Sequence, residues 1–186
     1  MPLQKVTRQE IILGSIQVFR RRGYYRTSMS DLAKELNLTK GAFYHHFSNK
    51  ETVMLQALDA TTAWFRRKIF SVAYEEDLTA AERLRKMGDY TYRAFTDYPG
   101  GCFFANTVLE TSHVEDTFID SVLRFFGHWE NALINILKES KPLAQAKADA
   151  QKIIADIEGS IILMQLYKDP SRLKQALDRG LNFLNP

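Results

Sequence analysis

Apolar residues recur along this chain at intervals of three and four, the spacing that places them on one face of an α-helix. Ile12, Ile16 and Phe19 form the first such face. They lie on the segment 7–22, where charged and polar residues fill most other positions, and Gly23 ends the segment. The pattern predicts an amphipathic helix there.

Two shorter helices are expected next. Ser28, followed three residues later by Asp31, resembles a capping box with Asp in the place usually given to Glu or Gln. Asn37 can end this helix, because Asn tolerates the left-handed backbone of a tight turn. Thr39 then caps a second helix over about 40–46. Two short helices joined by a three-residue turn make a helix-turn-helix.

The helical spacing continues through the rest of the chain, and the breaks between periodic segments hold Pro, Gly or helix-capping residues. Further helices are expected at about residues 50–72, 79–96, 102–110, 115–139, 143–167 and 170–184. No segment is convincing as a β-strand. The sequence therefore predicts an all-α fold of nine helices.

Charge divides unevenly along the chain. The first 50 residues hold nine Lys or Arg and three acids, a balance of +6, whereas the whole chain carries only +3. A basic N-terminal end on a slightly acidic body is expected of a protein that binds a polyanion with that end. The alternative is a basic face that is merely solvated.

Other features narrow the class of protein. The single cysteine, Cys102, can form neither an internal disulfide nor a zinc cluster. No window approaches the roughly 18 apolar residues of a membrane span, and the N-terminus lacks the apolar core of a signal peptide. We therefore expect a cytoplasmic protein with no membrane span, metal or cofactor.

An enzyme is the rival class of function. His45 and His46 could suggest metal binding, but neighbours on a helix point about 100° apart, and no third ligand lies near them in the sequence. The chain holds no Gly-rich phosphate loop, G-x-S-x-G or H-E-x-x-H motif. We therefore predict that the protein is not an enzyme.

A pattern of particular residues in a fixed order extends over about positions 7–55. Its members are Ile12, Phe19, Gly23, Thr27, Asp31-Leu32-Ala33, Leu36, Leu38-Thr39-Lys40-Gly41, Tyr44-His45-His46-Phe47 and Lys50-Glu51. In this order they resemble the TetR/AcrR family of bacterial transcriptional regulators. Ser15 and Asn37 depart from the family, in which alanine and glycine are common at these positions. The rest of the chain is similar in helix number, helix length and break positions, and in the segment PGGCFFANTVLE.

The resemblance implies a DNA-binding domain at 1–50 and an effector-binding and dimerisation domain at 51–186. It implies a repressor that binds a palindromic operator in double-stranded DNA as a homodimer and leaves it when a small apolar or aromatic effector binds. The residues carried over as DNA contacts are Thr27, Ser28, Thr39, Lys40, Gly41, Tyr44, His45 and Lys50. The alternative for Thr27, Ser28 and Thr39 is that they only cap helices.

The last two predicted helices are the expected dimer interface, over about 143–184. Two apolar stripes are candidates: Ile153, Ile157, Ile161 and Met164 on one helix, and Leu173, Leu177, Leu181 and Leu184 on the other. In the family such a pair forms a four-helix bundle across a dimer axis. Alternatively, both stripes belong to the core of one chain. A helical interaction module that has lost DNA binding is a further alternative, which the retained Lys40, Gly41, Tyr44 and Lys50 argue against.

An aromatic-rich segment separates the two ends of the chain and is the candidate effector pocket. The residues expected to line it are Trp64, Phe65, Tyr92, Phe95, Cys102, Phe103, Asn106, Glu110, Phe126 and Trp129. Alternatively, these aromatic residues are simply core. Cys102 is expected in the first turn of a helix, where the helix dipole favours the thiolate. The alternative function is therefore a repressor that senses electrophiles or oxidants through Cys102, unless this residue only fills a corner.

Overall fold

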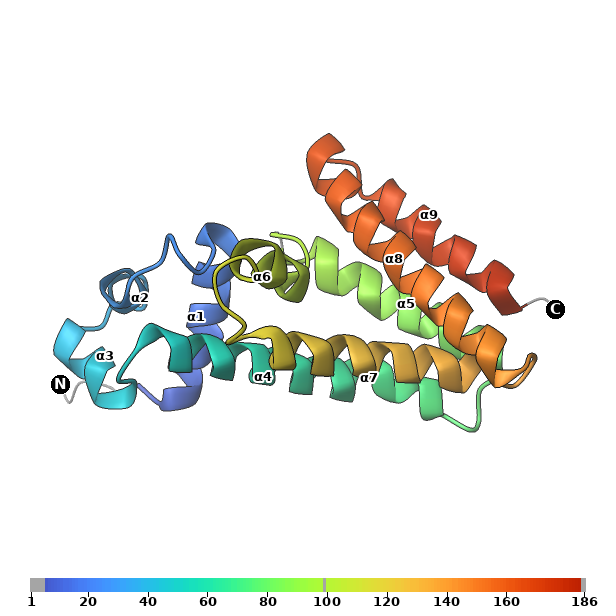
Figure 1. Cartoon of the computed structure of the whole chain (residues 1–186), viewed down its shortest axis with the longest axis horizontal. Coiled ribbons are helices and arrows are strands. Elements are labelled where there is room, and N and C mark those ends of the chain that lie inside the picture. The colour runs from blue at the N-terminus through green and yellow to red at the C-terminus, as the bar shows by residue number, and fades with distance from the viewer. Residues whose placement is uncertain (1–5, 99, 185–186) are drawn as a thin grey trace. The chain divides into compact units, whose positions relative to one another are not determined.

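The computed structural model describes residues 6–98 and 100–184, and within these ranges the chain is helical without a strand (Figure 1). The helices are α1 (Arg8–Arg22), α2 (Met29–Glu35), α3 (Lys40–His46), α4 (Lys50–Lys68), α5 (Ala80–Thr96), α6 (Phe103–Thr111), α7 (Ile119–Leu137), α8 (Leu143–Tyr167) and α9 (Ser171–Gly180). Two 3₁₀ helices, η1 (Phe70–Tyr74) and η2 (Leu181–Leu184), follow α4 and α9. The predicted all-α class is confirmed. In the described ranges, none of these helices combines the length and the apolar character that crossing a membrane requires.

Three predicted helices extend beyond the observed ones, and the one expected at 115–139 spans only Ile119–Leu137 as α7. The helix expected to reach residue 72 ends at Lys68, and the 3₁₀ helix η1 follows it with Phe70 and Val72 still buried. The one expected to reach 184 likewise divides into α9 and η2. A short 3₁₀ segment can bury the same apolar positions as an α-helix, so apolar spacing does not reveal the change.

Helix caps are set locally by the sequence. Ser28 caps α2, and both bonds of the predicted capping box with Asp31 are present. Asn37 adopts the predicted left-handed backbone, with φ at 55°. Leu38 then donates its backbone N–H to the carbonyl oxygen of Ala33 at 2.8 Å, which closes the turn. Two more capping boxes begin α1 and α5, formed by Thr7 with Glu10 and by Thr79 with Glu82.

The chain separates into two compact units. The first holds the residues up to Thr62 together with Phe103–Val122, and the second holds Ala63–Cys102 and Leu123 onward. The first unit thus contains α1, α2, α3, most of α4, and α6. The division of function at residue 50 remains a prediction.

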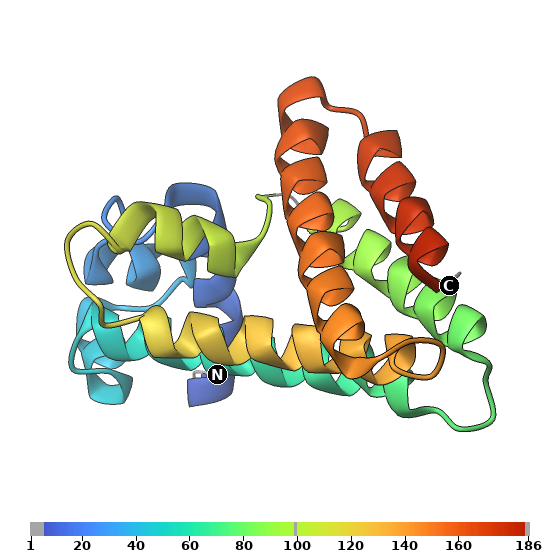
Figure 2. The same ribbon diagram turned by 45° about the vertical axis from the view of Figure 1, so that its right-hand side comes forward.

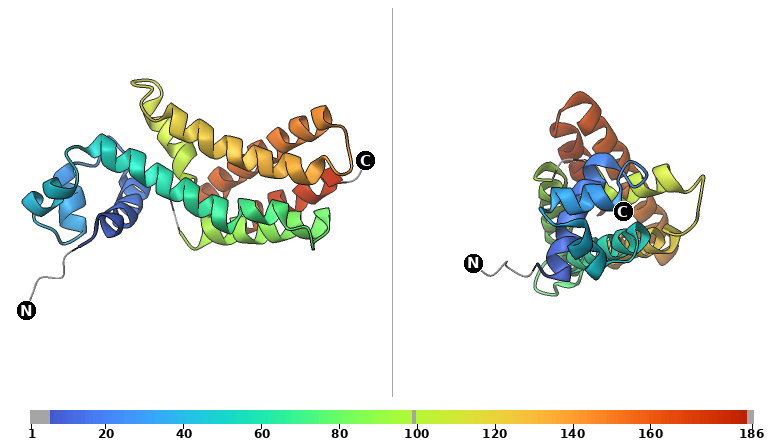
Figure 3. Two further views of the ribbon diagram at one scale, coloured as in Figure 1. Left: turned by 90° about the horizontal axis from the view of Figure 1, so that it is seen from below. Right: turned by 90° about the vertical axis from the view of Figure 1, so that its left-hand side faces the viewer.

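The first unit is built around buried side chains from its short helices. Helices α2 and α3 lie next to each other (Figure 3), and Leu32 of α2, Phe43 of α3 and Phe47 just after α3 are almost completely buried. On α1, a Cβ at Gly14 would lie 2.1 Å from a methyl carbon of Leu36. A side chain at position 14 would therefore have to displace the side chain of Leu36 at the end of α2.

The second unit has an aromatic core. Phe65, Phe70, Phe125 and Trp129 are all buried, and the ring centroids of Phe65 and Phe125 lie 5.1 Å apart in an edge-to-face arrangement. Phe70 stacks on Trp129 with 6.1 Å between centroids. The aromatic residues of this segment are thus core to a large extent.

Helices α8 and α9 run antiparallel, side by side, with α9 next to α5 (Figure 2). The predicted stripe on α8 is buried within the chain, with Ile153 and Ile157 each 3% exposed and Ile161 1% exposed. The stripe therefore belongs to the core of the single chain, and the expectation that it faces a dimer partner is wrong. The opposite face of α8 is exposed and carries Ala155, Gly159, Ile162, Leu163 and Leu166.

Candidate nucleic-acid interface

Helix α3 presents one exposed face. Lys40, Gly41, Tyr44 and His45 are exposed, whereas Phe43 on the same helix is fully buried. Thr39 caps the helix by accepting the backbone N–H of Ala42 at 3.1 Å. The structure thus brings five of the eight predicted DNA-contact residues to the start and outer side of α3.

The chemistry of this face suits nucleic acid. The ammonium of Lys40 lies 5.9 Å from the ring centroid of Tyr44, so one cation and one phenol lie next to each other on the surface. A Cβ added to Gly41 would meet no atom within 4 Å. Packing inside the chain therefore does not require glycine at this position, but close approach by a molecule from outside would.

The rear of α3 is fixed to α1. Arg8 donates to the carbonyl oxygen of His46, the last residue of α3, at 2.6 Å. The same guanidinium carbon lies 4.1 Å from the ring centroid of Phe47. These contacts satisfy one of the free carbonyl oxygens at the end of a helix of only seven residues and help to orient its outer face.

Ser28 and Thr27 differ in exposure. Ser28 is exposed at the start of α2. Thr27 is 1% exposed, and its hydroxyl donates to the carbonyl oxygen of Gly23 at 2.7 Å. The side chain of Thr27 therefore closes the turn between α1 and α2, which favours the structural alternative, and its contact with DNA remains a prediction.

Lys50 points inward. Its ammonium donates to the carbonyl oxygen of Tyr24 at 2.8 Å and lies 4.0 Å from the centroid of that ring. Burial lowers the pKa of Lys50, while the charges of Glu110 and Glu115 oppose this shift. A phosphate contact would have to use the remaining N–H groups of the ammonium or replace the bond to Tyr24.

The arginines at the end of α1 bind α2. Arg21 pairs with Glu35, and Arg22 lies 3.4 Å from Glu35 and 3.6 Å from Asp31. These ion pairs give the arginine run at the end of α1 a structural role that only the fold reveals.

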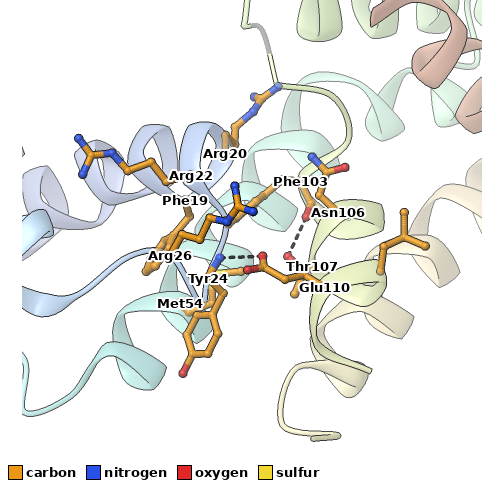
Figure 4. Close-up of a pocket in the computed structure, with 12 residues that line it drawn as sticks. Phe19, Arg20, Arg22, Tyr24, Arg26, Met54, Phe103, Asn106, Thr107 and Glu110 are labelled. Carbon is orange, nitrogen blue, oxygen red and sulfur yellow. Dashed lines mark hydrogen bonds between the residues drawn. The ribbon is translucent and has the colours of Figure 1, made fainter. Parts of the chain in front are cut away.

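Glu110 of α6 lies against the turn after α1 (Figure 4). Its two carboxylate oxygens accept the backbone N–H groups of Tyr24 at 2.7 Å and Tyr25 at 2.8 Å. Beside it is a pocket of about 440 Å³, lined by Phe19, Arg20, Arg22, Gly23, Tyr24, Arg26, Met54, Phe103, Asn106, Thr107, Leu109 and Glu110. Glu110 was predicted to bind a ligand, but both of its oxygens are engaged in hydrogen bonds to the chain itself.

The other predicted ligand residues fall into different surroundings. Phe65, Phe95 and Trp129 are buried in the aromatic core, and Phe126 is stacked on Trp129 with 6.3 Å between centroids. The void beside Trp129 has a volume of about 20 Å³, too small for more than one water molecule.

The second unit also has open grooves. One of about 470 Å³ is lined by half-exposed aromatic rings, among them Trp64 and Tyr90, and by the cations Arg67, Lys68 and Arg93. Another, of about 430 Å³, contains Tyr92 and lies between α5 and α9. Trp64 and Tyr92 therefore line separate grooves.

Cys102 is 3% exposed and directly precedes α6. Its thiol donates a hydrogen bond to the carboxyl group of Glu158 on α8, and burial raises the pKa of that carboxyl to about 7. A hydrogen-bond donor retains its proton, whereas the thiolate is the reactive form of cysteine. Across the described ranges, no three His, Cys, Asp or Glu side chains gather in a way that could hold a metal ion.

Comparisons with known proteins agree with this architecture. Residues 11–57 match the family model described as bacterial regulatory proteins, tetR family, and residues 80–179 match tetracyclin repressor-like, C-terminal domain. An uncharacterised HTH-type transcriptional regulator of Lactococcus lactis is 26% identical over 92% of this chain and 90% of its own length. The HTH-type transcriptional repressor DhaR of a Mycobacterium species is 27% identical over 91% of this chain and 88% of its own.

Solved structures show the same fold. A TetR transcriptional regulator from Legionella pneumophila is 19% identical, with a TM-score of 0.84 over 97% of both chains. A TetR-family regulator from Cytophaga hutchinsonii is 26% identical, with a TM-score of 0.80 over 99% of this chain and 96% of its own.

Proposed function

Because the chain belongs to the TetR family of bacterial regulatory proteins, which are helix-turn-helix regulators of transcription, we propose that it is a repressor released from DNA by a small molecule. The observation that carries the proposal is the exposed face of α3, where Lys40, Tyr44 and His45 surround Gly41. The relative named as a transcriptional repressor is consistent with this direction of regulation.

In this proposal α3 enters the major groove of double-stranded DNA. Lys40 and His45 donate to base edges or phosphates, and the hydroxyl of Tyr44 binds phosphate. Gly41 allows the backbone of α3 to approach the bases. Ser28 and Thr39, at the starts of α2 and α3, place hydroxyl groups where they can meet phosphate oxygens.

One such unit reads few base pairs, so specificity requires two copies on a palindrome. We place the dimer contact on the exposed face of α8. Ile162 is 57% exposed and Leu166 68% exposed, and Gly159 has open space around it. Two copies of this face, related by a two-fold axis, would bury each other's apolar residues.

The proposed effector is a small apolar or aromatic molecule bound by the C-terminal part of the chain. Support comes from the groove where half-exposed Trp64 and Tyr90 offer aromatic faces. The alternative trigger is modification of Cys102. Its burial and its bond to Glu158 favour the non-covalent effector. The proposed site of action is the cytoplasm, where the operator is.

Selection from a library of random DNA duplexes tests the proposal. We expect the purified protein to enrich a palindromic sequence, with an affinity that falls steeply with salt concentration because phosphates are neutralised. Enrichment of no sequence, or an affinity that is the same at low and high salt, would refute the proposed function.

A further inference from the structure

Glu110 has an unusual position for an acidic residue in a DNA-binding unit. Its two carboxylate oxygens accept the backbone N–H groups of Tyr24 and Tyr25, two consecutive residues of the turn that joins α1 to α2. Of the residues the structure describes, none forms an ion pair with Glu110. Two backbone N–H dipoles therefore bind its charge, which also interacts with the charge of Lys50.

The turn is shaped to admit this carboxylate. Gly23 has φ at +80°, and a Cβ there would lie 2.6 Å and 2.8 Å from the two oxygens of Glu110. Any other residue at position 23 would be strained and would also push the carboxylate away. Gly23 therefore does more than end α1, because it leaves the space that Glu110 fills.

Hydrogen bonds connect this turn directly to the start of α2. Thr27 donates its hydroxyl to Gly23 at 2.7 Å and its backbone N–H to Tyr24 at 3.2 Å. The next residue, Ser28, caps α2. The position of Tyr24 thus determines where α2 begins, and α3 follows α2 after a tight turn.

We propose that Glu110 is a positioning residue for DNA recognition, whose carboxylate holds the α1–α2 turn in the conformation that orients α2 and α3. The inference rests on the proposed DNA-binding function. In this role Glu110 does not contact DNA. Its negative charge binds the two backbone N–H groups of the turn, at the cost of a slight repulsion of the polyanion.

The test compares Glu110→Gln with Glu115→Gln. Both variants remove one negative charge from the same unit, but within the described ranges Glu115 accepts only side-chain hydroxyls, from Tyr25 at 3.2 Å and from Thr117 at 3.1 Å, and holds no backbone N–H of the turn. On the duplex that the wild type selects, we expect Glu115→Gln to bind as tightly as the wild type or slightly more tightly. Glu110→Gln, with equal net charge, is expected to bind about tenfold more weakly, because an amide can accept at only one oxygen.

Two further measurements separate positioning from folding. Glu110→Asp keeps the carboxylate on a shorter side chain and is expected to recover part of the affinity. In Glu110→Gln we expect faster hydrogen exchange at the amides of Tyr24 and Tyr25 with an unchanged circular dichroism spectrum. Equal affinity of Glu110→Gln and Glu115→Gln would overturn the inference. The inference would also be overturned if both Glu110 variants lost affinity only in proportion to a loss of helix content.

Failure of the proposed function is recognised separately, because it appears in the wild type. A wild-type protein that selects no duplex refutes the repressor proposal before any variant is compared. A wild type that binds, with Glu110→Gln equal to Glu115→Gln, refutes only the role of Glu110.

Discussion

Lys50 binds Tyr24 twice, through a 2.8 Å hydrogen bond to its carbonyl oxygen and through its ring, whose centroid lies 4.0 Å from the ammonium. The backbone N–H of the same tyrosine is bound by Glu110 at 2.7 Å. Both polar backbone groups of Tyr24 are thus held by side chains distant in sequence. A substitution of Lys50 should therefore affect the stability of the fold as well as DNA binding.

Lys50→Met is expected to lower both stability and operator affinity. The loss of a hydrogen bond from a charged group and of a cation–π contact should cost about 1–3 kcal/mol, which urea denaturation would measure. Lys34→Met, on the exposed side of α2, is the control and should leave stability unchanged. If Lys50 served only as a phosphate contact, stability would be unaffected. The slope of log affinity against log salt concentration would then become shallower by about one, the contribution of one phosphate contact.

Gly41→Ala should separate stability from DNA binding. Because a Cβ at this position meets nothing in the free protein, alanine should stabilise α3 by about 0.5–1 kcal/mol through its higher helix propensity. The same methyl group should obstruct the approach of α3 to DNA and weaken operator binding. A raised melting temperature with reduced affinity in fluorescence anisotropy is the expected pair of results. Unchanged affinity would place α3 farther from DNA than we propose.

If the exposed face of α8 forms the proposed dimer, Leu166→Glu should turn it into a monomer without unfolding the chain. Leu166 is 68% exposed on α8, so a carboxylate there is tolerated in one chain but would be buried against a second copy. Leu123→Glu, at a leucine that is 63% exposed on α7, is the matched control. Light scattering should give half the native mass for the first variant alone. A dimer that persists in Leu166→Glu would show that another surface mediates association.

Glu158 makes stability depend on pH. Its pKa is raised to about 7 in the fold, so the folded chain keeps a proton that the unfolded chain loses. The contribution of Glu158 to stability should be greatest below pH 4.5, fall as pH rises to about 7, and stay level above it, a total loss of up to about 3 kcal/mol from this group. Glu158→Gln should therefore be more stable than the wild type at pH 8 and equal to it at pH 4, measured by urea denaturation. Glu76→Gln, at an exposed position, should differ from the wild type at neither pH.

Features that depend on neighbouring residues were predicted well from the sequence. The capping box of Ser28 with Asp31 and the left-handed Asn37 follow from contacts within a few residues. The outward residues of α3 came from the family resemblance, and the burial of Phe43 and Phe47 on its inner side agrees with them.

Features that depend on distant residues could not be predicted in this way. Apolar spacing gives the same signal whether Ile157 packs on its own chain or on a partner. A lysine at a helix start has the same sequence pattern whether it binds a phosphate or, like Lys50, a carbonyl oxygen. Glu110 is 86 residues from Tyr24, and no local pattern joins them.

The tight contact between Gly14 and Leu36 implies that two glycines of the first unit are required for different reasons, one for folding and one for DNA binding. At position 14 a side chain would collide inside the protein, so substitution there should reduce the amount of folded protein in a cell. At position 41 a side chain is accommodated, and substitution should leave abundance intact while repression is lost. A mutational scan that scores abundance and repression independently would thus sort these two glycines into different classes.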